Sequence, residues 1–283
     1  MPKIHLHDRI ARFYRRDVLT VPMKTSFITA LDLVERTQLK TIYVLDEGRL
    51  EGFINTDLVG DKFIDRKLYQ KPLTDVKIED IMESYTENDE RIVRTRQTLK
   101  TAASQIVSNS YLDELPVVDY HGKLIGRITL WDLLMSIQSK IDASLKVRTM
   151  ASSNVITCNK DHSIYYVAAN IRASNHNAII VVDSDDKPTG IICRHNLARE
   201  LLASPCKKGA KYRNKTVFSS MAFFITAEEV MSRNFIEVHE NEDLKRVIGW
   251  MVQTRSEIYP VVDDNGKLVR IVSARDIISK LLE

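Results

Sequence analysis

Cysteine is scarce in this chain of 283 residues, and long hydrophobic runs are missing. The three cysteines, Cys158, Cys193 and Cys206, have neither paired nor metal-like spacing, which argues against a disulfide framework and favours reduced thiols. No apolar run approaches the length that crosses a bilayer, and the N-terminus does not read as a leader. We therefore expect a soluble, cytoplasmic protein without membrane contact.

Glycine clusters and a strong net charge are also missing. The nine glycines form no phosphate-cradling loop, and a formal charge of +3 is too small to indicate nucleic-acid binding by itself. The chain has no nucleophile with a base signature and no Cys/His metal spacing, and His5, His7 and Asp8 are read as incidental. We predict a protein that is not an enzyme, with no catalytic residues, no metal ion and no catalytic cofactor.

What the chain does contain is one pattern that occurs four times. Apolar residues recur with the spacing i, i+3, i+4, i+7, which is the buried stripe of an amphipathic helix. The four stripes are Phe27, Ala30, Leu31, Val34; Leu99, Ala102, Ala103, Ile106; Ile164, Val167, Ala168, Ile171; and Leu244, Val247, Ile248, Met251. The residues just before these helices suit a helix start: Ser26, Thr98, Ser163 and Asp243.

A pair of short strands and a second helix follow each stripe. The first strands are expected at 41–45, 115–118, 178–182 and 258–262, and the second at 50–54, 124–129, 189–193 and 268–273. Turn signals such as Asp46-Glu47-Gly48 and His121-Gly122 stand between the two strands of a pair. The unit is therefore strand, helix, strand, strand, helix, and we predict an α/β (α+β) fold of four such repeats.

Three segments carry a resemblance to a known family: 115–119 (Leu-Pro-Val-Val-Asp), 126–132 (Gly-Arg-Ile-Thr-Leu-Trp-Asp) and 259–263 (Tyr-Pro-Val-Val-Asp). They resemble the CBS domain family, and the resemblance covers nearly the whole chain. It implies two tandem CBS pairs in a flat disc, as in the gamma subunit of AMP-activated protein kinase and in archaeal four-repeat proteins. The expected divisions are a first pair at 1–140 (repeat 1 about 10–70, repeat 2 about 76–140), a second pair at 141–283 (repeat 3 about 145–203, repeat 4 about 225–283) and a basic connecting loop at 204–224.

Two segments place a hydroxyl three residues before a carboxylate where a strand turns into a helix. They contain Thr129 and Asp132 in repeat 2, and Ser273 and Asp276 in repeat 4. A helix start presents N–H groups and positive dipole, which suit a phosphate. The resemblance implies an adenine nucleotide (AMP, ADP or ATP, with S-adenosylmethionine as a further option), whose ribose hydroxyls bind the aspartate and whose phosphate meets the Ser or Thr.

The resemblance also implies contacts for the base and the phosphates. The base is expected beside Ile92, Val93, Leu115 and Pro116 in repeat 2, and beside Val238, Tyr259 and Pro260 in repeat 4. Arg194 and His195 of repeat 3 are expected to meet, with Arg275, the phosphates bound by repeat 4. Repeat 2 has Trp131 in place of Arg275, so we expect repeat 4 to hold phosphates better.

Repeats 1 and 3 depart from this pattern. Repeat 3 has Cys193 and Asn196 at the two positions, and in repeat 1 Asp57 lies one residue too early to match. The simplest expectation is one competent cleft in each pair. A plainer interpretation of both hydroxyl-carboxylate segments also stands, because the same spacing forms a capping box that satisfies the helix's own N–H groups.

Three functions remain open at this point. The preferred one is a nucleotide-sensing regulatory protein that signals to an unknown partner protein, as a monomeric disc or a homodimer. The second is nucleic-acid binding through a basic stretch that also fits a solvated loop, a phosphate lid or a docking patch for an acidic partner; its basic residues are Lys207, Lys208, Lys211, Arg213 and Lys215. The third is an adaptor protein whose clefts stay empty.

Overall fold

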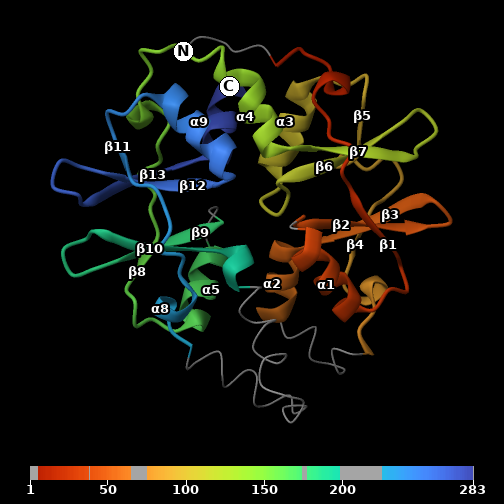
Figure 1. Ribbon diagram of the computed structural model, residues 1–283, viewed down its shortest axis with the longest axis horizontal. Coiled ribbons are helices and arrows are strands. Elements are labelled where there is room, and N and C mark those ends of the chain that lie inside the picture. The colour runs from red at the N-terminus through yellow and green to blue at the C-terminus, as the bar shows by residue number, and fades with distance from the viewer. Residues whose placement is uncertain (1–5, 38, 65–74, 174–176, 198–224, 283) are drawn as a thin grey trace.

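A computed structural model of the protein describes residues 6–37, 39–64, 75–173, 177–197 and 225–282. The predicted α/β fold of four repeats is confirmed. Viewed down its shortest axis, the molecule is a disc with one repeat in each quarter (Figure 1). Repeats 2 and 4 lie at the top of this view and repeats 1 and 3 at the bottom. The basic stretch at 207–215 lies outside the described residues.

The elements follow the expected order. Repeat 1, preceded by the 3-10 helix η1 (Ile10–Arg12), contains β1 (Leu19–Pro22), α1 (Phe27–Thr37), β2 (Thr41–Asp46), β3 (Arg49–Asn55) and α2 (Thr56–Ile64). Repeat 2 contains η4 (Ile78–Asp80), β4 (Glu83–Ser84), β5 (Val93–Arg94), α3 (Leu99–Ser108), β6 (Glu114–Val118), β7 (Leu124–Thr129) and α4 (Leu130–Gln138). Repeat 3 contains η5 (Val147–Thr149), β8 (Thr157–Cys158), α5 (Ile164–Ala173), β9 (Ala178–Val182) and β10 (Pro188–Cys193). Repeat 4 contains α8 (Ala227–Val230), β11 (Val238–His239), α9 (Leu244–Thr254), β12 (Ile258–Val262), β13 (Leu268–Ser273) and α10 (Ala274–Leu282).

Each repeat forms its own small sheet around a β-hairpin. The strand before the first long helix pairs in parallel with the strand after that helix, as β5 does with β6. That second strand pairs antiparallel with the next one, as β6 does with β7. The hairpin tips point away from the middle of the disc (Figure 1). Gly48, Gly122 and Gly266 have positive φ at three of these tips, a conformation that glycine adopts without a steric penalty.

All four residues predicted at the helix starts accept a hydrogen bond from the first turn. Ser26 and Thr98 accept from the backbone N–H groups of Thr29 and Thr101, at 3.2 and 3.4 Å. Ser163 and Asp243 accept from those of Tyr166 and Lys245, at 3.3 and 2.8 Å. Each bond satisfies a donor that has no partner inside the helix.

Among the described helices, none is long and apolar enough to span a bilayer.

The two pairs are joined through the helices of repeats 2 and 4. Helices α3 and α4 pack against α9 and α10, and their apolar stripes share one core with parts of both sheets. Within the second pair, the two sheets meet through Ile180 and Ile191 of repeat 3 and Ile258 and Ile271 of repeat 4. The hydroxyl-carboxylate turns of repeats 2 and 4 therefore sit on elements that are fixed by burial on several sides.

The segment that enters each repeat crosses the sheet of the other repeat in its pair. Arg15, before repeat 1, exchanges two backbone hydrogen bonds with Arg127 of β7, both at 2.8 Å. Ser152, before repeat 3, makes the same exchange with Ile271 of β13, at 2.7 and 3.0 Å. Arg127 and Ile271 both lie two residues before the hydroxyl at the strand end, so Arg15 and Ser152 hold equivalent places.

Candidate functional site

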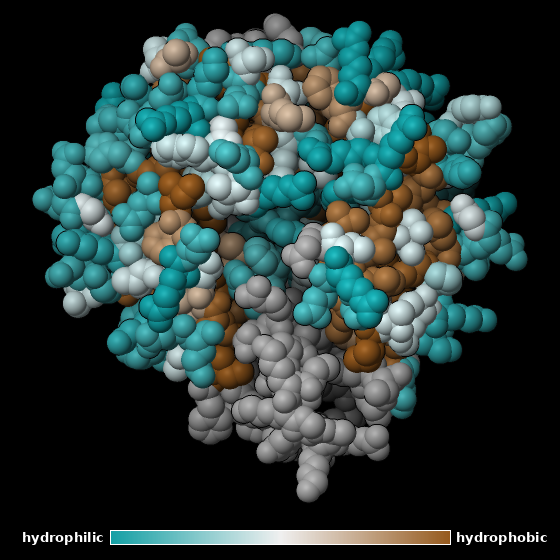
Figure 2. Space-filling view, viewed as in Figure 1, coloured by the Kyte–Doolittle hydropathy of each residue, from teal (hydrophilic) through white to brown (hydrophobic). Residues whose placement is uncertain are grey.

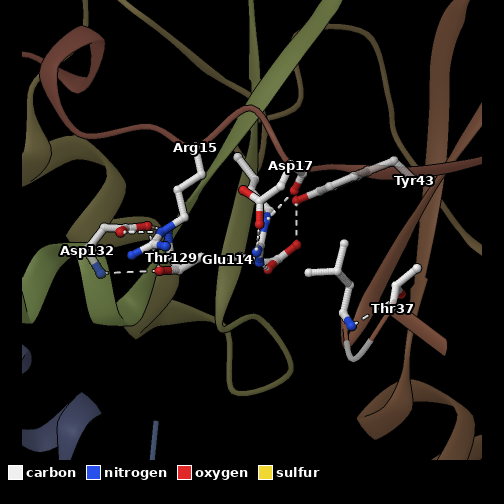
Figure 3. Close-up of polar contacts among 9 residues, drawn as sticks. Arg15, Asp17, Thr37, Tyr43, Glu114, Thr129 and Asp132 are labelled. Atoms are coloured by element: carbon white, nitrogen blue, oxygen red, sulfur yellow. Dashed lines mark hydrogen bonds and ion pairs between the residues drawn. The ribbon is translucent and has the colours of Figure 1, made fainter. Parts of the chain in front are cut away.

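At the start of α4, Thr129 and Asp132 form a closed capping box. The Thr129 hydroxyl donates to Asp132 Oδ2 at 2.6 Å, and the Thr129 backbone N–H donates to the same oxygen at 3.0 Å. The Asp132 backbone N–H donates back to Thr129 Oγ1 at 3.2 Å. Arg15 Nε then donates to the other carboxylate oxygen, Oδ1, at 2.7 Å (Figure 3). Asp132 is 1% exposed, so its two oxygens are enclosed and bonded.

The start of α10 has the same residue spacing but an open arrangement. The Asp276 backbone N–H donates to Ser273 Oγ at 2.9 Å, which is half of a capping box. The Asp276 atom Oδ2 is buried and has no hydrogen-bond partner among the described residues. A buried carboxylate oxygen without a donor is costly, and native structures rarely leave one without a reason. Asp276 therefore has an unused acceptor at the place where a ligand hydroxyl is expected.

The turns of repeats 1 and 3 use amides instead. In repeat 1, Asn55 Oδ1 accepts from the Leu58 backbone N–H at 2.8 Å. In repeat 3, Asn196 Oδ1 accepts from the Cys193 backbone N–H at 2.9 Å. The Asn55 oxygen caps α2 and the Asn196 oxygen binds the end of β10, so neither turn repeats the hydroxyl-carboxylate arrangement.

The first cleft lies between repeats 1 and 2 and encloses a cavity of about 100 Å³. Thr129 and Trp131 line it from repeat 2, together with Arg15 from the entering segment. Lys40 lines it from repeat 1, and Arg255 reaches it from the end of α9 in the other pair. This volume is below the roughly 300 Å³ at the lower end of typical ligand pockets.

Beside the first cleft, a buried ion pair within repeat 2 is bonded to repeat 1. Arg127 donates from Nη1 to Glu114 and from Nη2 to Asp17 Oδ2 in the entering segment, the latter at 2.8 Å. The Tyr43 hydroxyl donates to Glu114 Oε1 at 3.0 Å from the sheet of repeat 1 (Figure 3). Burial raises the pKa of the Glu114 carboxyl, and Arg127 opposes that shift. The network fixes the wall of the cleft.

The second cleft lies between repeats 3 and 4 and encloses about 30 Å³. It is lined by Ser273, Arg275 and Asp276, together with Glu257 and, from repeat 2, Asp113. Asp113 lines both cavities, so the two clefts share one side chain.

Arg275 lies in the second cleft but has a contact that the sequence did not predict. Its guanidinium donates to the backbone carbonyls of Ile106, Asn109 and Leu112 (the last two at 3.0 and 2.9 Å) and pairs with Asp113 Oδ1 at 3.1 Å. These carbonyls stand at the C-terminal end of α3, where cations are favoured by the helix dipole. Arg275 therefore ties repeat 4 to repeat 2, and its donors are directed to that helix end.

Four equivalent positions meet near the middle of the disc. Each position lies six residues before the aspartate at the end of the first hairpin strand of its repeat. The four residues are Lys40, Asp113, Asn177 and Glu257. Lys40 Nζ donates to Glu257 Oε1 at 2.6 Å, and Asn177 Nδ2 donates to the Ser110 carbonyl at 2.8 Å. Both bonds join repeats that lie diagonally across the disc. Hydrophilic side chains surround the hollow near the middle of the face in Figure 2.

The charges at this centre shift one another's pKa values. Burial, and then Glu257, raise the pKa of Asp113 well above its ordinary value. Burial would also raise the pKa of Glu257, but Lys40, His195 and a hydrogen bond with Asp113 together outweigh burial and lower that pKa to about 2. Asp113 therefore retains its proton more readily, and Glu257 stays ionised against Lys40. The centre that both clefts share is mixed in charge rather than uniformly basic.

Most residues predicted to contact the base or the phosphates are buried. Val93, Leu115, Val238 and Tyr259 are core side chains, 0 to 2% exposed, and neither cavity is lined by them. Pro116 and Pro260 are also buried, and Ile92 is partly buried. Arg194 is 5% exposed and lies over the Tyr111 ring at 4.8 Å, while His195 is close enough to Glu257 to lower its pKa.

Sequence reasoning missed three residues of this site. Arg15 comes from a segment outside the repeated unit, and Lys40 and Arg255 reach the first cleft only through the assembly of four repeats. A signal existed for Lys40, because aligning the repeats places it with Asp113, Asn177 and Glu257 as the one cation.

The arrangement is that of a protein of paired repeats, with one cleft between the two repeats of each pair. The family model of the CBS domain matches residues 10–57, 78–139, 147–203 and 227–283. The chain belongs to the CBS domain family.

A similar solved structure covers the whole disc. Protein MJ1225 from Methanocaldococcus jannaschii, described as a proposed archaeal homolog of g-AMPK, has a TM-score of 0.81 at 18% identity, covering 96% of this chain and 99% of that one. At this identity the likeness shows the fold. The CBS pair of protein MJ0100, crystallised with 5'-methylthioadenosine and S-adenosyl-L-methionine, is 29% identical over 49% of this chain and the whole of that one, with a TM-score of 0.40.

A curated relative is much longer than the shared part. A homoserine O-acetyltransferase of Methanococcus vannielii is 31% identical over 170 residues, which are 59% of this chain and 31% of that protein. The chain thus spans under a third of that relative's length, and the activity in its name concerns a larger protein.

Proposed function

We propose that this chain is a non-catalytic regulatory protein that binds adenosine-containing ligands at the starts of α4 and α10. Asp132 and Asp276 would accept from the ribose hydroxyls, and Thr129 and Ser273 would approach the 5' substituent. The CBS family membership supports the ligand class. A partner protein would respond to the change in packing between the pairs, which requires a ligand that favours one packing over the other.

The observation that carries the proposal is the unused oxygen of Asp276. Its Oδ2 is buried at the edge of the second cleft, beside Ser273 and Arg275, and lacks a donor among the described residues. A ribose diol supplies two O–H donors, and hydrogen bonds to an ionised carboxylate are among the stronger ones. Binding of a diol would therefore remove the cost of that orphaned oxygen.

The test is calorimetric titration with AMP, ADP, ATP and S-adenosylmethionine. We expect saturable binding of at least one of them to the wild-type protein and a large loss of affinity in Asp276→Ala. Asp185→Ala, which removes an exposed carboxylate from the hairpin of repeat 3, serves as the matched control. Equal affinity in the wild type, Asp132→Ala and Asp276→Ala would refute the site assignment. Melting curves that millimolar ligand leaves unchanged would favour an adaptor with empty clefts.

A further inference from the structure

The N-terminal segment places a cation against the carboxylate at the start of α4, next to the first cleft. Arg15 is held by its backbone to Arg127 of β7, and its Nε donates to Asp132 Oδ1 at 2.7 Å. Gly126 of β7 makes this close approach possible, because a Cβ at that position would stand 2.2 Å from the Arg15 carbonyl oxygen. The segment therefore lies directly on β7, and Arg15 is the residue it presents to the start of α4 (Figure 3).

The second pair offers a built-in comparison. Ser152 is held to Ile271 of β13 by the same two backbone bonds that hold Arg15 to Arg127. A serine side chain has one hydroxyl on a single carbon, whereas an arginine spans several bonds and ends in a charged fork. In that pair, Asp276 Oδ2 lacks a donor among the described residues. The carboxylate is thus closed by a cation where the entering segment carries Arg, and open where it carries Ser.

We propose that Arg15 is an internal competitor for the ligand of the first cleft. Its guanidinium uses the Asp132 oxygen that a ribose diol would use, so ligand enters only when Arg15 swings away. This inference rests on the proposed function and deepens it. The second cleft fills first, and the first cleft fills at higher ligand concentration.

The geometry allows this exchange without unfolding the segment. The Arg15 side chain is 38% exposed while that of Asp132 is 1% exposed, so the arginine has solvent to move into and the aspartate does not. The backbone bonds between Arg15 and Arg127 do not depend on where the guanidinium points. The competition is uneven, because a charged donor binds a carboxylate more strongly than neutral hydroxyls do.

The experiment measures each cleft alone by calorimetry with AMP, ADP, ATP and S-adenosylmethionine. The Asp276→Ala protein reports on the first cleft, and Arg15→Ser is added to it. The Asp132→Ala protein reports on the second cleft, and Ser152→Arg is added to it. We expect Arg15→Ser to tighten binding on the order of tenfold and Ser152→Arg to weaken it by a similar factor, the change that corresponds to about 1.4 kcal/mol.

Arg12→Ser is the matched control, because Arg12 lies on the same segment, is 77% exposed and pairs with Asp8 rather than Asp132. It should leave both affinities unchanged, and melting curves without ligand confirm that each variant is folded. Weaker or unchanged binding in Arg15→Ser, with the wild type still binding, would overturn the competition and leave the proposed function standing. A lack of binding in every protein, wild type included, would refute the proposed function itself.

Discussion

The starts of α4 and α10 share their residue spacing but differ in what surrounds the carboxylate. Asp132 is bonded by Thr129 and Arg15 and is fully enclosed, whereas Asp276 retains a buried oxygen without a donor among the described residues. Part of the difference is local, because Thr129 donates to Asp132 whereas Ser273 only accepts from the Asp276 backbone. The other part comes from Arg15 and Ser152, which lie more than a hundred residues away in the chain. The local motif and the distant neighbours therefore decide together whether an acceptor is left for a ligand.

The residue directly before the carboxylate extends the comparison. Trp131 lies beside the first cleft and packs against the main core. Arg275, at the same place in repeat 4, binds the end of α3 in repeat 2. Repeat 4 thus binds the other pair through the turn that leaves its carboxylate open, whereas Trp131 in the turn of repeat 2 lines the first cleft.

The largest effect should come from cutting that tie. Arg275→Ala removes a charge pair with Asp113 and leaves several carbonyls at the end of α3 without their donor. We expect a loss of about 3 kcal/mol in the free energy of unfolding, measured by urea denaturation. The surface control Arg233→Ala breaks an exposed pair with Glu228 and should cost less than about 1 kcal/mol. Similar losses in the two variants would show that Arg275 is not a tie between the pairs.

The two carboxylates should differ in ligand-free stability. Asp132→Ala removes the capping partner of Thr129 and the ion pair with Arg15, so we expect a loss of about 2 kcal/mol. Asp276→Ala removes an oxygen that has no donor among the described residues, and the expected loss is below about 0.5 kcal/mol. Urea denaturation of both variants measures the difference. Equal losses would mean that Asp276 is as well satisfied as Asp132.

The acid shared by the two clefts should make stability depend on pH. The pKa of Asp113 is higher in the folded protein than its ordinary value of 3.8, so the folded state keeps a proton that the unfolded chain releases. Its contribution is complete below about pH 4 and declines as the pH rises toward the folded pKa. Asp113→Asn, which copies Asn177, should remove this decline. Melting temperatures of the wild type and Asp113→Asn, measured from pH 4 to 7 with Asp185→Asn as control, test this pH dependence. Identical profiles for the wild type and Asp113→Asn would contradict the prediction.

The smallest expected difference concerns the two hydroxyls. The Thr129 hydroxyl takes part in two hydrogen bonds of a closed capping box, whereas the Ser273 hydroxyl accepts one from the Asp276 backbone. Thr129→Ala should therefore cost about 1.5 kcal/mol and Ser273→Ala about 0.7 kcal/mol. Thermal unfolding of the ligand-free variants gives the order, and a larger loss in Ser273→Ala would reverse the comparison.

The fold could be predicted because its determinants are local and repeated. The apolar stripes, the residues at the helix starts and the turn glycines each act within a few residues, and four copies support one another. The sequence indicates only part of the candidate site. The spacing of Thr129 and Asp132 can be read from the chain, but the contact between Arg15 and Asp132 cannot. Arg275 shows the same limit: its charge suggested a phosphate contact, and the contact with the Ile106 carbonyl of α3 exists only because the pairs assemble.

The four equivalent positions at the middle of the disc limit which residues a chain of four repeats can carry there. Lys40, Asp113, Asn177 and Glu257 are copies of one position that face one axis, where the pair distance between Lys40 and Glu257 is 2.6 Å. Four identical acids or four identical bases would repel one another at such distances in a poorly solvated centre. A closed ring of repeats therefore cannot keep the same ionised residue at all four copies of this position, and here the copies carry one cation, two acids and one amide.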